Sequence, residues 1–412
     1  MEMDSSSCFC KICLLLCSVS VLVLANGVPS IHAQPKVFDV KSFGAIADGQ
    51  TNDSKAFLDV WIQTCHYEGG SERRLFVPLG TYMVWPVVLK GPCAGPITVT
   101  VEGVVKGPVD KSTFSLIINW PVDFQSVDGL LIDGGGTFDG RGQEAWSYNN
   151  CSKNSNCKLL PVSLRFNYVK NALISNITSV NSKFFHFVIF SCDALEFRHV
   201  QIVAPDESPN TDGIHIGHSS RITIADSVIS TGDDCVSVGP GSKGVKVVGV
   251  QCGPGHGFSV GSLGKYPGEA DVSELSVSGC TMVGTQNGVR IKTWASPLES
   301  SAYNISFQDI TMNNYCPVGG CSKESGSNVQ IKDVWFSKIQ GTSASQLAVK
   351  LVCSPKVPCT NINLDSIDLT YPGGHAESNC TYVNGESFFF FVKERRISRR
   401  AEPPRLAFST DK

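Results

Sequence analysis

The stretch that decides the fold is DALEFRHVQIV (residues 193–203), which is followed by SRITIADSVI (220–229) and KGVKVVGVQ (243–251). In each of them apolar and polar residues alternate, which is the period of a β-strand. The stretch NALISNITSV (171–180) belongs to the same series and begins 22 residues before the first one. Between the stretches the chain is rich in Gly, Asn, Ser and Asp, the residues that favour tight turns.

A second type of strand alternates with the first, in GIHIG (213–217), CVSVG (235–239) and GFSVG (257–261). Strands that recur at one short period, without long helical patterns between them, predict an all-β solenoid. One coil cannot bury its own apolar face, whereas stacked coils bury a continuous core. A β-sandwich is the alternative, but sandwiches do not usually repeat at one coil length.

Residues 48–65 follow a different pattern, with apolar positions at Ala56, Phe57, Val60 and Trp61 after a capping residue. This spacing predicts a short helix. We expect the helix to cover the open end of the solenoid, where unpaired strand edges would otherwise invite aggregation.

The N-terminus and the charge of the chain indicate export. Lys11 precedes an apolar run at residues 12–25, and Ala33 offers a cleavage point, so residues 1–33 are predicted to be a signal peptide. The run is short for a membrane span of about 20 residues, although an uncleaved anchor is the alternative. A net charge of −3 excludes a generally basic, nucleic-acid-binding surface. We expect a secreted protein that is free of the membrane after cleavage.

Export makes the cysteines interpretable as a disulfide framework. Four of the 17 precede residue 34, which leaves an odd number, 13. Close spacing suggests the pairs Cys151–Cys157, Cys235–Cys252, Cys316–Cys321 and Cys353–Cys359. Cys380 is our candidate for the cysteine without a partner. Glycosylation sequons begin at Asn52, Asn150, Asn176, Asn304 and Asn379.

Three short motifs carry candidate chemistry: NTDG (210–213), GDD (232–234) and GHG (255–257). Asp234 follows Asp212 by 22 residues, and His256 follows Asp234 by another 22. In a solenoid of that coil length, the three side chains occupy equivalent positions on successive turns, about 4.8 Å apart. We therefore predict a ladder of Asp212, Asp234 and His256 on one outer face, with Asp233 beside it.

Crowded carboxylates repel each other, so one of them holds its proton to a higher pH than it would alone. Any single aspartate is more simply read as a turn or cap residue, but three aspartates and a histidine in coil register favour a reaction. Glycoside hydrolysis uses such a set directly, because one carboxylic acid protonates the leaving oxygen while another carboxylate activates water.

Arg290 and Lys292 lie on one face of the next predicted strand, because successive side chains alternate. A guanidinium grips a carboxylate bidentately and an ammonium supplies a point charge. Such a pair beside acidic groups suits a uronic-acid substrate, although a solvated strand face often carries Arg and Lys as well.

Four runs of the sequence resemble the plant polygalacturonases over residues 37–380: NTDGIHIG (210–217), TGDDCVSVGPG (231–241), CGPGHGFSVGSLG (252–264) and NGVRIKTW (287–294). The resemblance implies a right-handed parallel β-helix, here residues 34–385, that needs no metal or organic cofactor. It implies hydrolysis of the α-1,4 bonds of polygalacturonic acid (pectin), with inversion, in the cell wall. Residues 261–266 and 284–288 look more like the exo-acting branch. We further expect a monomer.

The resemblance also implies a role for each motif residue. Asp233 is the expected general acid, and His256 supports its protonation. Asp212 and Asp234 are expected to hold the attacking water and take its proton. The expected substrate-binding residues are Asn210, Arg290, Lys292 and Tyr315.

Two regions depart from the family pattern. Residues 313–327 are turn-rich and lack the alternating strand that neighbouring coils have there, which displaces Tyr315 from its usual place. Residues 386–412 form an atypical tail with a Phe run and a basic block, and we expect it to be disordered. These departures motivate a second hypothesis, a catalytically impaired pectin-binding cell-wall protein. A pectate lyase is a third, and would need a calcium-binding carboxylate cluster.

Overall fold

The structure of the chain is a computed structural model that describes residues 34–70, 72–109, 122–149, 154, 159–315, 326–390 and 393–394. Several predictions lie outside these residues: the signal peptide, the pairs Cys151–Cys157 and Cys316–Cys321, and most of the tail from residue 395 onwards. In the described part of the chain, no helix is both long enough and apolar enough to cross a membrane.

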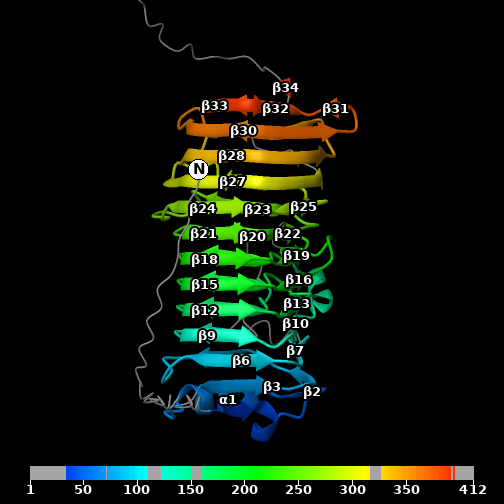
Figure 1. Ribbon diagram of the computed structural model, residues 1–412, viewed down its shortest axis with the longest axis vertical. Helices are drawn as coiled ribbons and strands as arrows, with labels where there is room; N and C mark the ends of the chain where they lie inside the picture. The colour runs from blue at the N-terminus through cyan, green and yellow to red at the C-terminus, as the bar shows by residue number, and fades with distance from the viewer. Residues whose placement is uncertain are drawn as a thin grey trace, which may run out of the picture. The chain divides into compact units, whose positions relative to one another are not determined.

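The strands stack in successive coils, each coil lying on the previous one (Figure 1). One face is a parallel sheet of eight strands in the order β5 (Val87–Lys90), β8 (Val122–Gln125), β11 (Leu164–Asn167), β14 (Phe187–Phe190), β17 (Ile214–Gly217), β20 (Asp234–Val238), β23 (Gly257–Leu263) and β26 (Val289–Thr293). This sheet carries the candidate site.

The other strands also pair in parallel, in two rows that continue from coil to coil. The longer row is β1 (Lys36–Asp39), β3 (Arg73–Val77), β6 (Ile97–Val101), β9 (Asp128–Asp133), β12 (Lys170–Ser175), β15 (Asp193–Arg198), β18 (Ser220–Ala225), β21 (Lys243–Val248), β24 (Val272–Ser278), β27 (Glu299–Tyr315), β28 (Asn328–Ser343), β30 (Cys359–Tyr371) and β33 (Val383–Phe390). The shorter row is β2 (Asp48–Asn52), β4 (Thr81–Met83), β7 (Val104–Lys106), β10 (Thr137–Asp139), β13 (Thr178–Val180), β16 (Gln201–Val203), β19 (Val228–Ser230), β22 (Gln251–Cys252) and β25 (Thr281–Val283).

A few elements lie outside these rows. A small sheet consists of β29 (Leu347–Val352), β32 (Glu377–Thr381) and β34 (Lys393–Glu394), and β31 (Gly374–His375) is antiparallel to β30. The described helices are α1 (Ser54–Cys65) and the 3-10 turns η1 (Val40–Phe43), η3 (Gly142–Glu144) and η4 (Trp146–Tyr148). The architecture is a right-handed parallel β-helix, so the predicted fold class is confirmed.

One apolar core runs through the coils because alternate side chains of every strand point inward. Phe124 and Phe166 stack in this core with ring centroids 5.5 Å apart, one coil above the other. The predicted helix is α1, which buries the expected apolar face. Its Phe57 and Trp61 pack edge-on against Tyr82 and Phe124, so the helix covers the first coils.

The coil length around the motifs matches the prediction. Ile214 pairs with Val236, 22 residues further on, and Val236 pairs with Phe258 after another 22. The next coil is longer, since Phe258 pairs with Val289, and an inserted loop accounts for the difference.

The eight-stranded sheet ends at β26, where the sequence predicts a missing strand. β27 and β28 pair directly, and no strand formed by described residues between them adds to β26. A cavity of about 500 Å³ opens there, lined by core residues such as Ile291, Met312 and Phe336. All five residues of β26 are partly exposed as a result.

Disulfides link different segments of the solenoid. The predicted pairs Cys235–Cys252 and Cys353–Cys359 form, and a third pair, Cys65–Cys93, links α1 to the loop after β5. The sequence analysis did not anticipate this third pair. Strands also continue further along the chain than predicted. β33 extends to Phe390, and β34 lies within the predicted tail, residues 386–412.

Candidate active site

Asp212 and Asp234 lie at the same level of adjacent coils, as predicted. The amide of Gly213 donates a hydrogen bond to the carbonyl of Asp234 at 2.9 Å, and the register of β17 and β20 places the two aspartates side by side. Both residues are at least nine-tenths buried. Asp233 lies in the turn before β20, where the chain enters the sheet.

His256 does not continue this ladder, which corrects part of the prediction. The register between β20 and β23 shifts, so that Asp234 pairs with Gly257 and Val236 pairs with Phe258. This bulge moves His256 level with Asp233, whose carbonyl accepts a hydrogen bond from the His256 amide at 2.8 Å. A bulge adds one residue to one strand of a pair, and equal sequence spacing does not reveal it.

Three groups hold the carboxylate of Asp233. His256 Nδ1 lies 2.7 Å from Oδ1, the Asp234 amide donates to Oδ1 at 2.8 Å, and Asn210 Nδ2 donates to Oδ2 at 3.1 Å. Burial favours the neutral form, but the hydrogen bond and charge of His256 outweigh it, so the pKa of Asp233 lies below its ordinary value. The loop of η4 supports this corner, because Asn149 Nδ2 donates to Asn210 Oδ1 at 3.0 Å.

Asp212 has the opposite electrostatic environment. Burial raises the pKa of its carboxyl well above the ordinary range, and the charges of Asp233 and Asp234 raise it further. The hydroxyl of Ser237 opposes this effect by donating a hydrogen bond to Oδ2 at 2.7 Å. The cluster therefore contains one carboxyl that resists ionisation and one that favours it.

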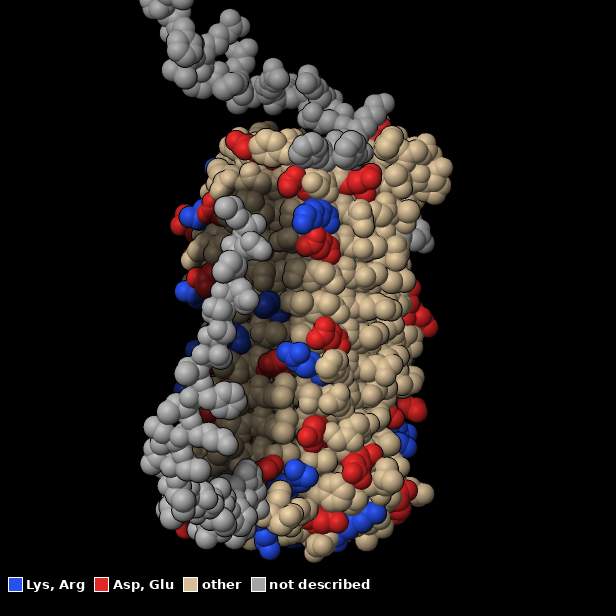
Figure 2. Space-filling model, in the orientation of Figure 1, with Lys and Arg blue, Asp and Glu red and all other residues tan. Residues whose placement is uncertain are grey.

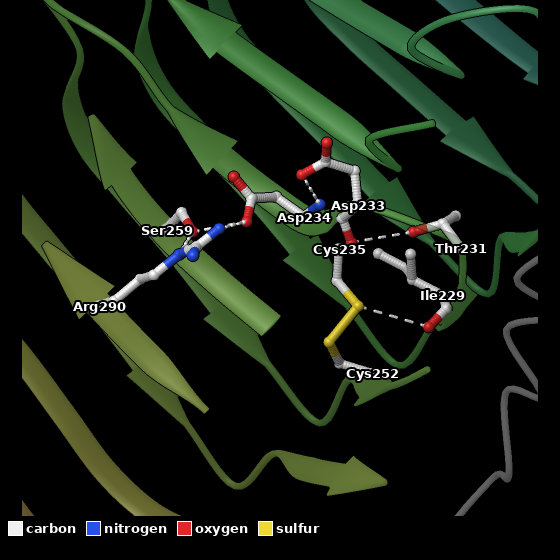
Figure 3. The surroundings of a disulfide bond; sticks show 8 residues. All are labelled: Ile229, Thr231, Asp233, Asp234, Cys235, Cys252, Ser259 and Arg290. Atoms are coloured by element: carbon white, nitrogen blue, oxygen red, sulfur yellow. Dashed lines mark hydrogen bonds and ion pairs between the residues drawn. A yellow bond between two sulfur atoms is a disulfide. The ribbon is translucent and has the colours of Figure 1, made fainter. Parts of the chain in front are cut away.

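Asp234 is bound by two cations and a hydroxyl. Arg290 Nη2 and Ser259 Oγ each donate to Oδ1 at 2.6 Å, while Lys292 Nζ donates to Oδ2 at 2.9 Å. Figure 3 shows Arg290 and Ser259 converging on this carboxylate, with the disulfide of Cys235 on the other side of the strand. The predicted basic pair thus lies next to the carboxylates. Its remaining N–H donors are those a substrate can use.

The structure adds three residues that the sequence analysis did not mark, His215, Ser237 and Ser259, in one row with Arg290. His215, Ser237, Ser259 and Arg290 are consecutive register partners on β17, β20, β23 and β26. Ser237 and Ser259 each donate to one of the buried aspartates. The first three residues follow Asp212, Asp234 and His256 by three positions each, so the 22-residue spacing contained the signal that identifies them.

Asp233, Asp234 and His256 bring potential metal ligands within 4.8 Å of one another. Their contacts do not favour a cation, because Asp233 and His256 are hydrogen-bonded to each other and Asp234 is neutralised by Arg290 and Lys292. The guanidinium and the ammonium beside this carboxylate repel a further cation. The arrangement is that of an acid–base site.

Tyr315, a predicted substrate-binding residue, ends β27 on the long row, where its backbone pairs with Ser343. Its side chain lies outside what the structure describes. Over the face shown in Figure 2, acidic and basic residues are interspersed without a broad basic patch. Arg290 and Lys292 are the cations that lie beside the carboxylates.

Comparison with known proteins identifies close relatives. The chain is 43% identical over 366 residues to an exopolygalacturonase of Platanus acerifolia, which covers 86% of this chain and 96% of the relative. It is 44% identical over 378 residues to a polygalacturonase of Gossypium barbadense, with 89% and 92% covered.

Solved structures show the same architecture. An endo-xylogalacturonan hydrolase from Aspergillus tubingensis superimposes with a TM-score of 0.75 at 25% identity, over 87% of this chain and all of the other. An exopolygalacturonase from Thermotoga maritima gives a TM-score of 0.65 at 17% identity, over 86% and 93% of the two chains, and shows the fold alone. The model of glycosyl hydrolases family 28 matches residues 68–390, which include the entire carboxylate cluster and its cations, and the chain belongs to this family.

Proposed function

We propose that the chain is a polygalacturonase that hydrolyses the α-1,4 bonds of polygalacturonic acid with inversion. The observation that carries the proposal is the placement of three aspartates beside Arg290 and Lys292, with opposed pKa shifts at Asp212 and Asp233. Paired titratable groups with opposed shifts are typical of sites that need both an acid and a base. The relatives named polygalacturonase and exopolygalacturonase support the same substrate.

Asp233 and His256 act together as the general acid. The 2.7 Å contact between Oδ1 and Nδ1 can hold one proton, written either as a carboxylate with an imidazolium or as a carboxylic acid with an imidazole. A galacturonate chain brings negative charge and excludes water, and both effects raise the pKa of an adjacent carboxyl. Substrate binding therefore moves the shared proton towards Asp233, from which it passes to the leaving oxygen.

Asp212 and Asp234 hold the attacking water and accept its proton. Their side-by-side placement on adjacent coils allows one water to contact both carboxylates. Arg290 and Lys292 hold the carboxylate of Asp234 in place, while Ser237 favours the ionised form of Asp212. In inverting glycosidases the acid and the base stand about 6.5–9.5 Å apart, which leaves room for this water.

Arg290 and Lys292 also bind the galacturonate carboxylate at the cleavage site. Each retains N–H groups beyond the one that bonds Asp234, because a guanidinium carries five and an ammonium three. Asn210 and Tyr315 complete the substrate contacts. The functional unit is a secreted monomeric catalytic domain of residues 34–385 that acts on wall pectin. We favour attack at chain ends, in keeping with the exopolygalacturonase relatives.

The test is product analysis with purified protein. On polygalacturonate we expect release of reducing ends, and on a defined hexagalacturonate an exo-acting enzyme releases monomers at first, whereas an endo-acting enzyme gives mixed lengths. Proton NMR of the first product should show the inverted anomer. Binding without release of reducing ends would favour the pectin-binding hypothesis, and an unsaturated product that absorbs in the ultraviolet would favour a lyase.

A further inference from the structure

His215 is joined to the candidate base by a chain of two hydrogen bonds. Its Nδ1 lies 2.8 Å from Ser237 Oγ, and Ser237 Oγ donates its hydrogen to Asp212 Oδ2 at 2.7 Å. A hydroxyl has one hydrogen, so Ser237 must accept the bond from His215 while Asp212 is ionised. In that state the imidazole carries its proton on Nδ1, and Nε2 presents a lone pair.

The imidazole is neutral and held in place. Burial lowers the pKa of His215 to about 4, and the nearby charges of Asp234 and Lys292 act on it with opposite signs. The ring of Phe185 lies against it with a centroid distance of 4.9 Å and an interplanar angle of 31°. These surroundings favour the neutral form of the His215 imidazole.

The Cε1–Nε2 edge of His215 lies against Gly239 of the next coil. A Cβ at Gly239 would lie 3.6 Å from Cε1 and 3.8 Å from Nε2, so this glycine leaves that edge of the ring without a side chain against it. No hydrogen-bond partner of Nε2 occurs among the described residues, and the atom is not among those enclosed without a partner. The half-buried imidazole can therefore offer Nε2 to a sugar hydroxyl, beside the carboxylates.

We propose that His215 is a substrate-contacting residue of this site, whose Nε2 accepts a hydrogen bond from a ring hydroxyl of a sugar bound beside the carboxylates. A hydroxyl fits this position better than a carboxylate, which has no hydrogen to donate and would face a lone pair. If Asp212 takes up a proton, both bonds of the chain can reverse and Nε2 becomes a donor. A hydroxyl matches either state, because it both donates and accepts.

The inference rests on the proposed function. Two substitutions separate the loss of Nε2 from the loss of the hydrogen bond to Ser237. His215→Asn places an amide nitrogen near the position of Nδ1, so it keeps the bond to Ser237 but loses Nε2. His215→Gln reaches the position of Nε2 but loses the bond to Ser237. The matched control is His199→Asn, an exposed histidine on the turn after β15 with a φ of 51° that asparagine adopts readily.

Activity on polygalacturonate provides the first readout. For His215→Asn we expect KM to rise about tenfold, the effect of one hydrogen bond, with kcat and the acid limb of the pH profile nearly unchanged. For His215→Gln we expect a smaller rise in KM and a shifted acid limb. Unchanged KM in His215→Asn, or equal changes in both variants that follow a loss of thermal stability, would overturn the inference.

A binding readout keeps the inference separate from the proposed function. Trigalacturonate is titrated calorimetrically into Asp233→Asn protein with and without His215→Asn. We expect about tenfold weaker binding when His215 is replaced, whether or not the parent protein hydrolyses pectin. Equal affinities, or no binding to either protein, would reject the role of His215. Absence of hydrolysis by the parent protein would reject the proposed function alone.

Discussion

Replacing Ser237 by alanine should move the acid limb of the activity profile to higher pH. Ser237 Oγ donates to Asp212 Oδ2 at 2.7 Å, and this bond favours the ionised form of a carboxyl whose pKa burial already raises. Without the hydroxyl the pKa of Asp212 rises further. Because Asp212 must be ionised to take a proton from water, activity at low pH falls.

The size of the shift follows from the bond that is lost. A hydrogen bond to a charged group contributes about 1.5–3 kcal/mol. One pH unit corresponds to about 1.4 kcal/mol, so the acid limb should move by about one to two pH units. Ser259→Ala is the matched control one coil away, because Asp234 keeps Arg290 and Lys292 after losing that hydroxyl. Its acid limb should move much less.

The assay is kcat/KM on polygalacturonate, measured across the pH range in which the folded state is stable. Thermal unfolding of each variant at each pH checks that the fall of activity at low pH is not caused by unfolding. An unmoved acid limb in Ser237→Ala would refute the assignment of Asp212 as a group that must ionise. Equal movement in Ser259→Ala would show that the effect is not specific to Asp212.

Three further predictions concern Lys292, the disulfide between Cys235 and Cys252, and Gly239. Lys292→Met removes one of two cations on Asp234, and kcat/KM should fall about 10- to 100-fold, whereas the exposed Lys246→Met should leave it unchanged. Replacing both Cys235 and Cys252 by alanine opens a link of sequence separation 17, and chemical denaturation should show a loss of about 3 kcal/mol. Gly239→Ala places a methyl group against His215 and 3.3 Å from the carbonyl oxygen of Ile216, so KM should rise with a small fall in melting temperature; an unchanged KM would argue against a sugar beside His215.

Most of the fold was predictable from the sequence because successive coils repeat the same alternation of apolar and polar residues. The alternation in residues 193–203 and 220–229 corresponds to β15, β16, β18 and β19, and the capping helix follows from apolar spacing alone. The sequence also indicated that the sheet of β26 is interrupted, and the described residues between β27 and β28 add no strand to it. The pairing of Cys65 with Cys93 was not, since their separation of 28 residues exceeds the local spacing we considered.

The residues of the site could be predicted from the sequence, but their hydrogen-bond and ion-pair partners could not. The spacing placed Asp212 beside Asp234 correctly, yet the bulge between β20 and β23 gives His256 to Asp233 instead. The sequence also marked Arg290 as a cation near the carboxylates without showing that it is already bonded to Asp234. Such pairings depend on side-chain direction and on single-residue shifts of register, neither of which residue spacing records.

The central claim is that Asp233 donates the proton on which cleavage depends, and its replacement by asparagine tests this most directly. Asn cannot supply the proton but retains the shape, and its amide oxygen can still accept the hydrogen bond from the Asp234 amide. We expect the rate of reducing-end release to fall by about 10²–10⁴, with an unchanged melting temperature, while Asp226→Asn at an exposed turn retains full activity. Near-normal hydrolysis by the Asp233→Asn protein would contradict the account.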